Sequence, residues 1–558
     1  MPTYTEAIGL LTAPHGPFAL ATIATSYGTC RAFVDRPASI QSAIARSVEL
    51  YGDRTFLVQG NTRVTFQQHA ETSFGAAHAL LSRYGMNQGD RLGILGFNSP
   101  AWIASLFGTA AAGGIVVPLK PQWRAPEVKF ALQHSDCRFL VVDQALWGRV
   151  SPIMPDLAGL TVFFIGDSAP AGTVSFGELI SSPVGIPPQI TVNEEDPFTM
   201  IYTSGTTGIP KAAIATHLGS ITQAQSGMLS RRAQALTSQD SVESDRSWIL
   251  VHPIANVNLH VVVVHSLLAG SKVVFTTEKH FNPLEILSLM ATEKITDWLV
   301  VPGRAHQVAE AIDPTLRDGL ASLQALTLSG YVAFPSVAKT IRERFPPTVQ
   351  LDIGYGLTEA TGTVAIAPGE YYTDRIGRGC VGLPLPCLEV QIVDEGGLPL
   401  PHGQTGEIYI RGAAIATGYW KDPERTASAF VDGWFRTADI GRMDPDGALY
   451  IVGRKGDRIN RAGAKIDPME IESSLMNHPS IAEVAVVGEI DELWGQKIIA
   501  FVVLKPSAQA TETELINLMT AHLARYKVPE RVVFRTDPLP RNAAGKVLKE
   551  ALLQGLHT

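Results

Sequence analysis

The chain has 558 residues, 45% of them hydrophobic, which is enough for roughly three or four structural units. Its 45 Lys and Arg stand against 53 Asp and Glu, and the net charge of −8 gives no indication of a nucleic-acid partner. Four scattered cysteines, Cys30, Cys137, Cys380 and Cys387, have no metal-ligand spacing, so reduced thiols in a cytoplasmic protein are expected. The start of the chain lacks the cations of a signal peptide, and the most apolar stretch, 257–270, is too short and polar for a transmembrane segment.

Short apolar runs alternate with helical patterns from about residue 90 to residue 356. An amphipathic stretch of this kind is 282–294. Strand, helix and strand in this rhythm predict α/β layers with largely parallel sheets. The runs that we expect to be buried strands are 91–97, 114–119, 139–143, 161–166, 198–205, 247–253, 271–277, 296–302 and 325–330.

The pattern changes between about residues 375 and 455. Short strands are expected at 388–394, 406–412, 433–439 and 448–453, separated by turn-rich segments without helices. This region is predicted to be a small antiparallel β unit.

The last hundred or so residues predict a compact α+β domain. Asp467 and Pro468 suit the start of a helix, and Glu470 follows the cap by three residues. Strands are expected at 482–490 and 497–504, and a second helix follows the capping pair Thr511 and Glu514.

"YTSGTTGIPK", residues 202–211, follows an apolar run and is suited to hold an anion. Glycines let the backbone approach a ligand closely, hydroxyls and backbone N–H groups donate to phosphate oxygens, and Lys211 adds a positive charge. An ordinary exposed turn is the alternative. The spacing matches neither a Walker loop nor a GxGxxG turn. The candidate residues in this loop are Thr203, Ser204, Gly205, Thr206, Thr207, Gly208 and Lys211.

"GYGLTEA", residues 354–360, adds the other parts of a nucleotide site. Tyr355 offers a flat surface for a base, Thr358 a donor to phosphate, and Glu359 an oxygen ligand for Mg²⁺. Further along, Asp439 is suited to accept from ribose hydroxyls. Arg454 and Lys546 lie on turn-rich segments nearer the C-terminus.

Together these segments resemble the adenylate-forming superfamily of acyl-CoA synthetases, luciferases and peptide-synthetase adenylation domains. The resemblance runs from about residue 40 to the end. It also rests on "GEIYIRG", "GWFRTADIG", "GRKGDRINRAGAKIDPMEIE", "YKVP" and "PRNAAGKVLK". It implies an α/β fold with a large N-terminal domain, 1–455, whose β-rich part is about 375–455. A small mobile C-terminal domain, 456–558, follows a hinge near Gly456.

The resemblance implies a two-step ligase, most like a free-standing acyl-CoA ligase, that uses ATP, Mg²⁺ and coenzyme A. A small-molecule carboxylic acid is joined to AMP, and a nucleophile then takes the acyl group. Both reactants of the first step are anionic, so the site must supply positive charge. The implied roles are phosphate shielding by 203–211, α-phosphate contact by Thr358, Mg²⁺ binding by Glu359, adenine packing by Tyr355, ribose binding by Asp439 and Arg454, and charge neutralisation by Lys546.

The C-terminal domain is expected to swing between the two half-reactions. Lys546 serves the first orientation, and residues 457–466 face the site in the second. Where the family often has Gly-Gly beside the expected CoA tunnel, this chain has Ala462 and Gly463.

Other departures fall on the segments expected to line the acid pocket. Ala212 follows Lys211 in place of glycine, and Asn256 stands at a usual histidine position. Residues 330–333 read Gly-Tyr-Val-Ala, so the pocket is expected to be reshaped. Its polar members favour an aromatic, cyclic or otherwise functionalised acid over a long fatty acid, and Arg304 is interpreted as a surface residue rather than a substrate contact. The candidate pocket residues are Asn256, Gly330, Tyr331, Val332 and Gly354.

Three functions stay open. The first is transfer to coenzyme A. The second is transfer to an amine or to the thiol of a separate carrier protein, which the altered tunnel and pocket residues favour slightly. The third, a non-catalytic nucleotide-binding relative, is opposed by the retention of Lys211, Glu359 and Lys546. The oligomeric state is open, with a homodimer as one option.

Overall fold

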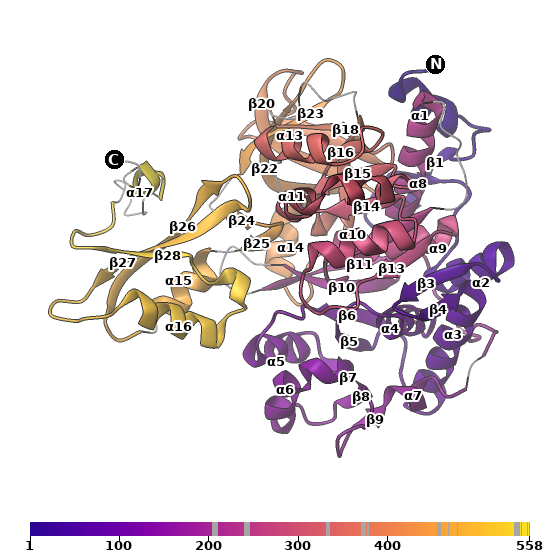
Figure 1. The fold of residues 1–558 in the computed structure, drawn as a ribbon, viewed down its shortest axis with the longest axis horizontal. Helices are drawn as coiled ribbons and strands as arrows, with labels where there is room; N and C mark the ends of the chain where they lie inside the picture. The colour runs from indigo at the N-terminus through magenta and orange to yellow at the C-terminus, as the bar shows by residue number, and fades with distance from the viewer. Residues whose placement is uncertain are drawn as a thin grey trace.

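The structure is a computed structural model with a large N-terminal domain and a small C-terminal domain, the latter at the left of Figure 1. It describes residues 1–182, 184–203, 210–238, 246–330, 335–369, 375, 379–454, 459–466, 468–476, 478–540, 547, 549–554 and 556. The boundary predicted at Gly456 lies outside these residues and stays a prediction.

One sheet of the large domain is built almost entirely from parallel strands. Its central strand Ile115–Leu119 is buried on both faces, which explains the continuous apolar run "IVVPL". The last strand pair is antiparallel and carries the 204–210 loop between its members. In order across the sheet, the strands are β11 (Lys211–Thr216), β10 (Pro197–Thr203), β6 (Ile115–Leu119), β5 (Arg91–Leu95), β7 (Cys137–Asp143), β8 (Thr161–Ile165) and β9 (Val174–Ser175).

The second sheet has a parallel centre and an antiparallel wing. The centre consists of β16 (Gln350–Leu357), β15 (Ala325–Ser329), β14 (Asp297–Val300), β12 (Ser247–Leu250), β13 (Lys272–Phe275) and β3 (Thr55–Gln59), with β4 (Thr62–Thr65) at its edge. The wing consists of β17 (Gly362–Ala367), β18 (Cys380–Pro384), β23 (Leu449–Arg454), β22 (Trp434–Met443), β20 (Thr405–Gly412) and β19 (Leu388–Val393), with β21 (Phe430–Val431) paired to β22.

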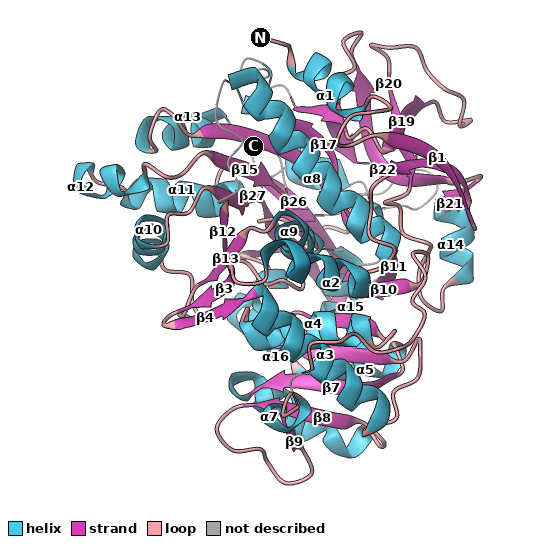
Figure 2. Cartoon of the chain, turned by 90° about the vertical axis from the view of Figure 1, so that its right-hand side faces the viewer, coloured by secondary structure: helices cyan, strands magenta, loops and turns pink. Residues whose placement is uncertain are grey.

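Helices fill the space between the two sheets and cover their outer faces. The central layer consists of α2 (Ile40–Tyr51), α3 (Phe66–Ser82), α4 (Pro100–Ala111), α8 (His217–Ser238) and α9 (Val257–Ala269). Figure 2 shows α8 and α9 side by side against the second sheet. The outer layers hold α10 (Pro283–Thr292), α11 (Pro302–Ala311) and α13 (Pro335–Arg344) on the second sheet, and α5 (Ala125–His134) and α6 (Trp147–Val150) on the first.

Smaller elements complete the large domain. They are α1 (Tyr4–Thr12), β1 (Leu20–Thr25), β2 (Gly28–Phe33), α7 (Phe176–Leu179), α12 (Pro314–Arg317) and α14 (Pro423–Ala429). Among the described residues, no helix combines the length and apolar character needed to cross a bilayer. All four cysteines are free of disulfides, as expected.

The predicted strands between residues 90 and 330 are confirmed, and so is the antiparallel pairing of the strands between residues 388 and 454. These strands continue the second sheet, because β18 pairs with both β17 and β23. The expectation of a helix-free segment is wrong. Asp422 accepts from the Arg425 backbone N–H and Pro423 occupies the first turn, so α14 forms between β20 and β22.

The C-terminal domain is a three-stranded sheet covered by helices, preceded by a short hairpin. Thr511 and Glu514 form the predicted capping box at the start of α16. The elements are β24 (Ile459–Arg461), β25 (Ala464–Ile466), α15 (Pro468–Met476), β26 (Ile481–Asp491), β27 (Gly495–Leu504), α16 (Glu512–His522), β28 (Arg531–Arg535) and α17 (Lys549–Gln554).

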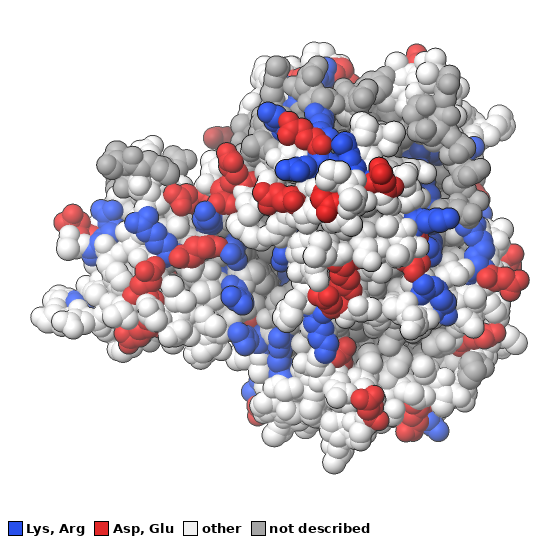
Figure 3. Space-filling model, in the orientation of Figure 1, with Lys and Arg blue, Asp and Glu red and all other residues white. Residues whose placement is uncertain are grey.

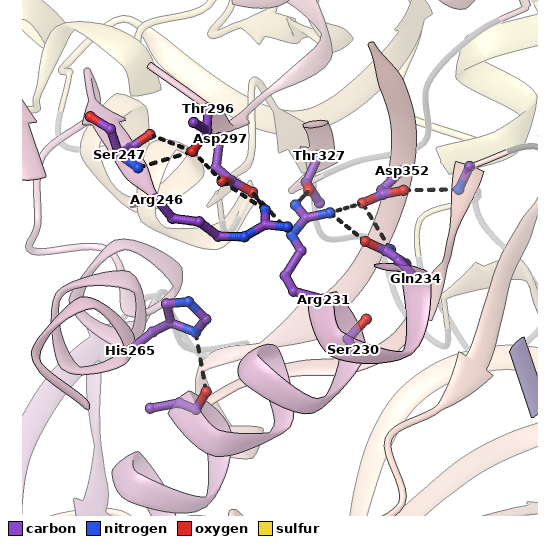
Figure 4. Close-up of polar contacts among 12 residues, drawn as sticks. Ser230, Arg231, Gln234, Arg246, Ser247, His265, Thr296, Asp297, Thr327 and Asp352 are labelled. Atoms are coloured by element: carbon purple, nitrogen blue, oxygen red, sulfur yellow. Dashed lines mark hydrogen bonds and ion pairs between the residues drawn. The ribbon is translucent and has the colours of Figure 1, made fainter. Parts of the chain in front are cut away.

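A buried ionic network ties α8 to the parallel strands of the second sheet (Figure 4). Arg231 contacts Asp297 of β14 at 3.1 Å and Asp352 of β16 at 2.5 Å, and both aspartates are fully buried. Arg246 contacts Asp297 at 3.0 Å. Burial raises the pKa of Asp297, but Arg231 and Arg246 outweigh it and hold this pKa below its usual range. These ion pairs fix the strands whose ends carry the candidate site.

Candidate active site

A cavity of 1120 Å³ opens where strands of both sheets end at their carboxyl sides and the C-terminal domain faces them. This edge is where open α/β sheets bind ligands. Figure 3 shows Lys and Arg side chains gathered along the groove between the two domains. The charged residues that line the cavity are Lys120, Arg124, Arg304, Arg461 and Arg525, with the carboxylates Glu359 and Glu530.

Glu359 and Lys211 form a buried ion pair at the inner end of this site. Their charged atoms are 3.2 Å apart, and Glu359 is 5% exposed. The Tyr419 hydroxyl donates to the same Glu359 oxygen at 2.8 Å, and the Lys211 ammonium in turn donates to that hydroxyl. Glu359 lies on a single 3₁₀ turn, Thr358–Ala360, after β16, whereas Lys211 begins β11. The turn and the strand thus bring the two predicted residues together.

Thr203 supplies a polar atom without a partner. Its Oγ1 is buried, and it has no hydrogen-bond partner among the described residues. Thr203 lines the cavity together with Thr358 and Glu359. A buried hydroxyl beside a carboxylate and an ammonium suits a Mg²⁺–phosphate group, since Mg²⁺ is bound through one or two carboxylates plus substrate phosphates. The described residues contain no group of three or more His, Cys, Asp or Glu that could hold a metal ion.

Tyr355 and Asp439 form a second polar pair, outside the cavity lining. The Tyr355 hydroxyl donates to Asp439 Oδ2 at 2.6 Å. Asp439 is 6% exposed, and its backbone N–H donates to Thr437 Oγ1. It lies opposite Arg454 in the β22–β23 ladder, which places the backbones of the two predicted ribose-binding residues side by side.

The C-terminal domain enters the cavity through the β24–β25 hairpin. Ala462 and Gly463 form its two-residue turn with φ values of 50° and 83°, which is the conformation of a type I′ hairpin turn. A Cβ on Gly330 would lie 3.0 Å from Gly463 Cα, and a Cβ on Gly463 would lie 3.0 Å from Val301 Cγ1, so a side chain at either position would crowd this contact. Asn460 Nδ2 donates to the Gly330 carbonyl at 2.9 Å. Within the segment 457–466 that is expected to face the site in the second orientation, residues 461–464 line the cavity, Ile459 and Ile466 lie in the core of the C-terminal domain, and 457–458 lie outside the described residues.

The opposite wall carries polar side chains that follow β12 and β14. His252 Nε2 is buried and has no partner among the described residues. Burial, with a smaller effect of Arg304, lowers the pKa of His252 to about 4, so the ring is neutral near pH 7. Arg304 lies 4.1 Å above the Phe281 ring and 5.6 Å from the Trp494 ring, on the cavity wall. The interpretation of Arg304 as a surface residue is therefore wrong, because α11 directs it inward.

Several sequence predictions fall outside the described residues. They are Ser204, Gly205, Thr206, Thr207, Gly208, Tyr331, Val332, Gly456 and Lys546, together with the side chain of Arg454. Of the remaining candidates, Thr203, Asn256, Gly330, Thr358 and Glu359 line the cavity. Lys211 contacts Glu359, Tyr355 pairs with Asp439, and Gly354 lies in β16 outside the lining.

Comparison with known proteins matches both domains. The profile of the AMP-binding enzyme family fits residues 44–420, and the profile of the AMP-binding enzyme C-terminal domain fits residues 470–546. The first match covers more than half of the chain. The chain belongs to the AMP-binding enzyme family.

Proteins similar to this chain differ in the acceptor that their names give. An indoleacetate–CoA ligase from Aromatoleum aromaticum is 32% identical over 82% of this chain and 87% of its own length. A fatty acid–acyl-carrier-protein ligase from Streptomyces coeruleorubidus is 31% identical over 89% and 92%. The solved amide bond synthetase from Marinactinospora thermotolerans is 27% identical, with a TM-score of 0.81 over 93% and 99%.

Tyr419, Asn460 and Trp494 were not predicted as site residues. Tyr419 bridges Lys211 and Glu359, Asn460 holds Gly330, and the Trp494 carbonyl accepts from Ala462 N–H at 2.7 Å. Tyr419 and Trp494 stand in turn-rich segments, where local sequence carries no periodic signal for what they will contact. The contacts of these three residues with the site are therefore known only from the structure of this AMP-binding enzyme.

Proposed function

We propose that this member of the AMP-binding family is an ATP-dependent acid–CoA ligase. A carboxylate oxygen attacks the α-phosphorus of ATP, the bond to the β-phosphate breaks, and pyrophosphate leaves. The thiol sulfur of coenzyme A then attacks the acyl carbon, the C–O bond to AMP breaks, and the thiol loses its proton. The observation that supports this proposal most directly is the Lys211–Glu359 ion pair at the inner end of a cavity that both domains line.

The polar groups at the inner end are suited to the first step. Lys211 and the Thr203 hydroxyl would meet phosphate oxygens, with Thr358 nearer the α-phosphate. Glu359 would hold Mg²⁺, which neutralises phosphate charge when bound. Because Lys211 already contacts Glu359, a phosphate entering here meets both an ammonium and a cation-binding carboxylate. The 204–208 backbone would complete the cradle.

The nucleoside would lie against β16 and β22. Asp439 would accept from the ribose hydroxyls, an acceptor role that it already has toward Tyr355. The ring of Tyr355 would pack against adenine, and Arg454 would approach the ribose from the facing strand. Lys546 would reach the α-phosphate and the attacking carboxylate after the C-terminal domain, hinged near Gly456, has turned.

The acid that fits this wall best is aromatic, cyclic or otherwise functionalised. His252 offers an unpartnered Nε2, and Asn256 and Arg304 line the same cavity. A long alkyl chain would leave His252 Nε2, which bonds to no described residue, without a hydrogen bond. The indole-bearing substrate in the name of the Aromatoleum relative is an acid of this kind. Gly330, Gly354, Tyr331 and Val332 would set the shape of the pocket.

The alternative acceptor is an amine or the thiol of a separate carrier protein. It is favoured by Ala462, which stands where CoA ligases often have glycine and which adopts a φ of 50°. The likeness to the amide bond synthetase supports the same alternative. A homodimer is compatible with either acceptor, and light scattering in solution distinguishes it from a monomer.

A panel of carboxylic acids tests the proposal. The full-length protein, ATP and Mg²⁺ are mixed with each acid, with coenzyme A, an amine or no acceptor, and pyrophosphate and products are measured by mass spectrometry. We expect an aryl acid to release pyrophosphate and to yield an acyl-CoA thioester. Amides formed at higher rates than thioesters would contradict the CoA assignment while leaving acid activation intact.

A further inference from the structure

A short segment of the C-terminal domain, residues 524–527, packs into the large domain. Ala524 is fully buried in the same apolar cluster as Trp123 and Val128 of the large domain. Tyr526 packs against that cluster and also against the core of its own domain. The two domains therefore share an apolar contact at this point, beside the cavity that Arg525 and Tyr526 line.

A buried lysine at the end of this segment joins the two domains. Lys527 is 5% exposed, and its Nζ lies 2.7 Å from Glu127 Oε1 and 2.7 Å from Glu470 Oε1. Glu127 lies in α5 of the large domain and Glu470 in α15 of the C-terminal domain. One of the two ion pairs therefore crosses the domain interface and the other travels with the C-terminal domain.

Both charges keep a partner if the domains separate. Lys527 retains Glu470. Glu127 lies in the first turn of α5, where its Oε2 accepts from the Arg124 backbone N–H at 3.0 Å, and a helix N-terminus stabilises a carboxylate. Breaking the Glu127–Lys527 pair by domain motion therefore strands no isolated charge.

The Glu127–Lys527 pair forms in the orientation observed. Here the β24–β25 hairpin contacts Gly330. The described residues on either side of Lys546, Leu539 and Val547, pack in a cluster on the face of the β26–β28 sheet that α17 covers. Neither residue lines the cavity. Bringing Lys546 to the phosphates requires the C-terminal domain to turn, which would withdraw Lys527 from Glu127.

We propose that Glu127 and Lys527 are positioning residues for acyl transfer: their ion pair selects the orientation in which the β24–β25 hairpin faces the acyl-adenylate. The inference rests on the two-step function proposed above. It implies that the pair favours the second half-reaction and opposes, or leaves unchanged, the first.

Glu127→Gln tests the pair with little change in shape, because glutamine can still accept from the Arg124 N–H. We expect acyl transfer from preformed adenylate to slow about tenfold, with pyrophosphate release in a single turnover unchanged or faster. Lys527→Met should give the same split. Asp156→Asn is the matched control. Asp156 Oδ2 lies 2.8 Å from the ammonium of Lys129, which stands on the same helix as Glu127, so this change removes an ion pair of α5 that does not involve the C-terminal domain. Equal slowing of both half-reactions, or of neither, would overturn the proposal.

A second readout needs no acceptor. Probes on Leu50→Cys and Ile490→Cys, both exposed and one in each domain, report interdomain distance by fluorescence energy transfer. We expect Glu127→Gln to shift the distance distribution while Asp156→Asn leaves it unchanged. An unshifted distribution would overturn the positioning role whatever the acceptor. If Glu127→Gln shifts the distance distribution but no carboxylic acid leads to pyrophosphate release, only the proposed function is contradicted.

Discussion

The candidate site holds two opposite charges, those of Lys211 and Glu359, in direct contact. Glu359, Lys211 and Tyr419 lie within hydrogen-bonding distance of one another and are largely buried. In a low-dielectric site such charges interact more strongly than in water. An entering phosphate would therefore replace some of the contacts that Lys211, Glu359 and Tyr419 make with one another.

Glu359→Gln should weaken the use of Mg²⁺ and ATP. The amide keeps an oxygen but loses the charge that binds a hard cation, and it also leaves Lys211 without its carboxylate partner. We expect the concentration of Mg²⁺ for half-maximal activity to rise, with partial recovery of rate at high Mg²⁺. Glu389→Gln, in a partly exposed pair with Arg411, is the control. Unchanged Mg²⁺ dependence would contradict the assigned role.

Lys546→Ala should separate the half-reactions. Removing the cation expected beside the attacking carboxylate should slow adenylate formation by about a hundredfold or more. Transfer from a synthetic acyl-adenylate should stay close to the wild-type rate. Single-turnover measurements of each step check this, and the pattern should be the reverse of that of Glu127→Gln. Equal loss in both steps would refute the role.

Sequence motifs pointed to Lys211 and Glu359, which the structure brings together. They did not point to Lys120, Arg124 or Arg525, which also line the cavity. Thr358 and Glu359 directly follow an apolar run, which marks the end of a buried strand. Tyr419 stands outside every motif segment, and the position of Asn460 inside one does not tell that its side chain contacts Gly330. Arg304 was misjudged because a cation after Pro302 looks like a surface residue until the direction of α11 is known.

At the scale of elements, the strands below the site depend on the buried Arg231 network. Arg231 also donates to Thr327 of β15 at 2.9 Å, so one side chain of α8 contacts three neighbouring strands. Such a network fixes the relative positions of the strands whose ends carry Val301, Gly330 and Thr358.

Asp352→Ala should destabilise the large domain by about 3–5 kcal/mol, since it leaves the buried Arg231 charge without one partner. Asp352→Asn should cost less, because it preserves hydrogen bonding. Urea unfolding followed by tryptophan fluorescence measures both, with Trp248 adjacent to Arg231 as a local reporter. Glu178→Gln, in an exposed pair with Arg83, should change stability little. Equal stability of the alanine and control variants would contradict this role for the network.

The strands were largely predictable because strands buried on both faces are continuously apolar. The pairing of β17 with β18, which joins the antiparallel wing to the parallel centre, was not, because strand order depends on contacts between distant segments. The helix α14 was missed although Asp422 and Pro423 form a recognisable start, since its seven residues hold no buried apolar stripe.

At the scale of the whole molecule, the orientation of the C-terminal domain is a property that no local pattern encodes. It depends on contacts between residues hundreds of positions apart, such as Asn460 with Gly330 and Lys527 with Glu127. The sequence resemblance implies two orientations, and in the structure residues 461–464 line the cavity.

Buried histidines should make the protein sensitive to acid. Burial lowers the pKa of His69 to about 3 and those of His217, His260 and His265 to about 4. The pKa of these rings in the unfolded chain is 6.5, so as pH falls the unfolded state binds protons before the folded state does. Their contribution to stability is therefore complete above pH 6.5. As pH falls it is lost between pH 6.5 and about 3 for His69 and between pH 6.5 and about 4 for the other three rings, by up to about 1.4 kcal/mol per pH unit for each ring.

Calorimetry between pH 7 and 4.5 checks this dependence. His69 packs between Phe56 and Phe107, so His69→Phe keeps the aromatic contact and should flatten the fall in melting temperature. His15→Gln, at an exposed position, should not. Identical slopes for wild type and His69→Phe would contradict a contribution from this ring.

The exchange of labelled pyrophosphate into ATP, without an acceptor, tests acid activation most directly. We predict that exchange requires both a carboxylic acid and Mg²⁺, proceeds without coenzyme A, and is strongly reduced in Lys546→Ala. Acid-dependent cleavage of ATP to ADP and phosphate, or exchange that proceeds only when coenzyme A is added, would contradict an acyl-adenylate formed in this cavity.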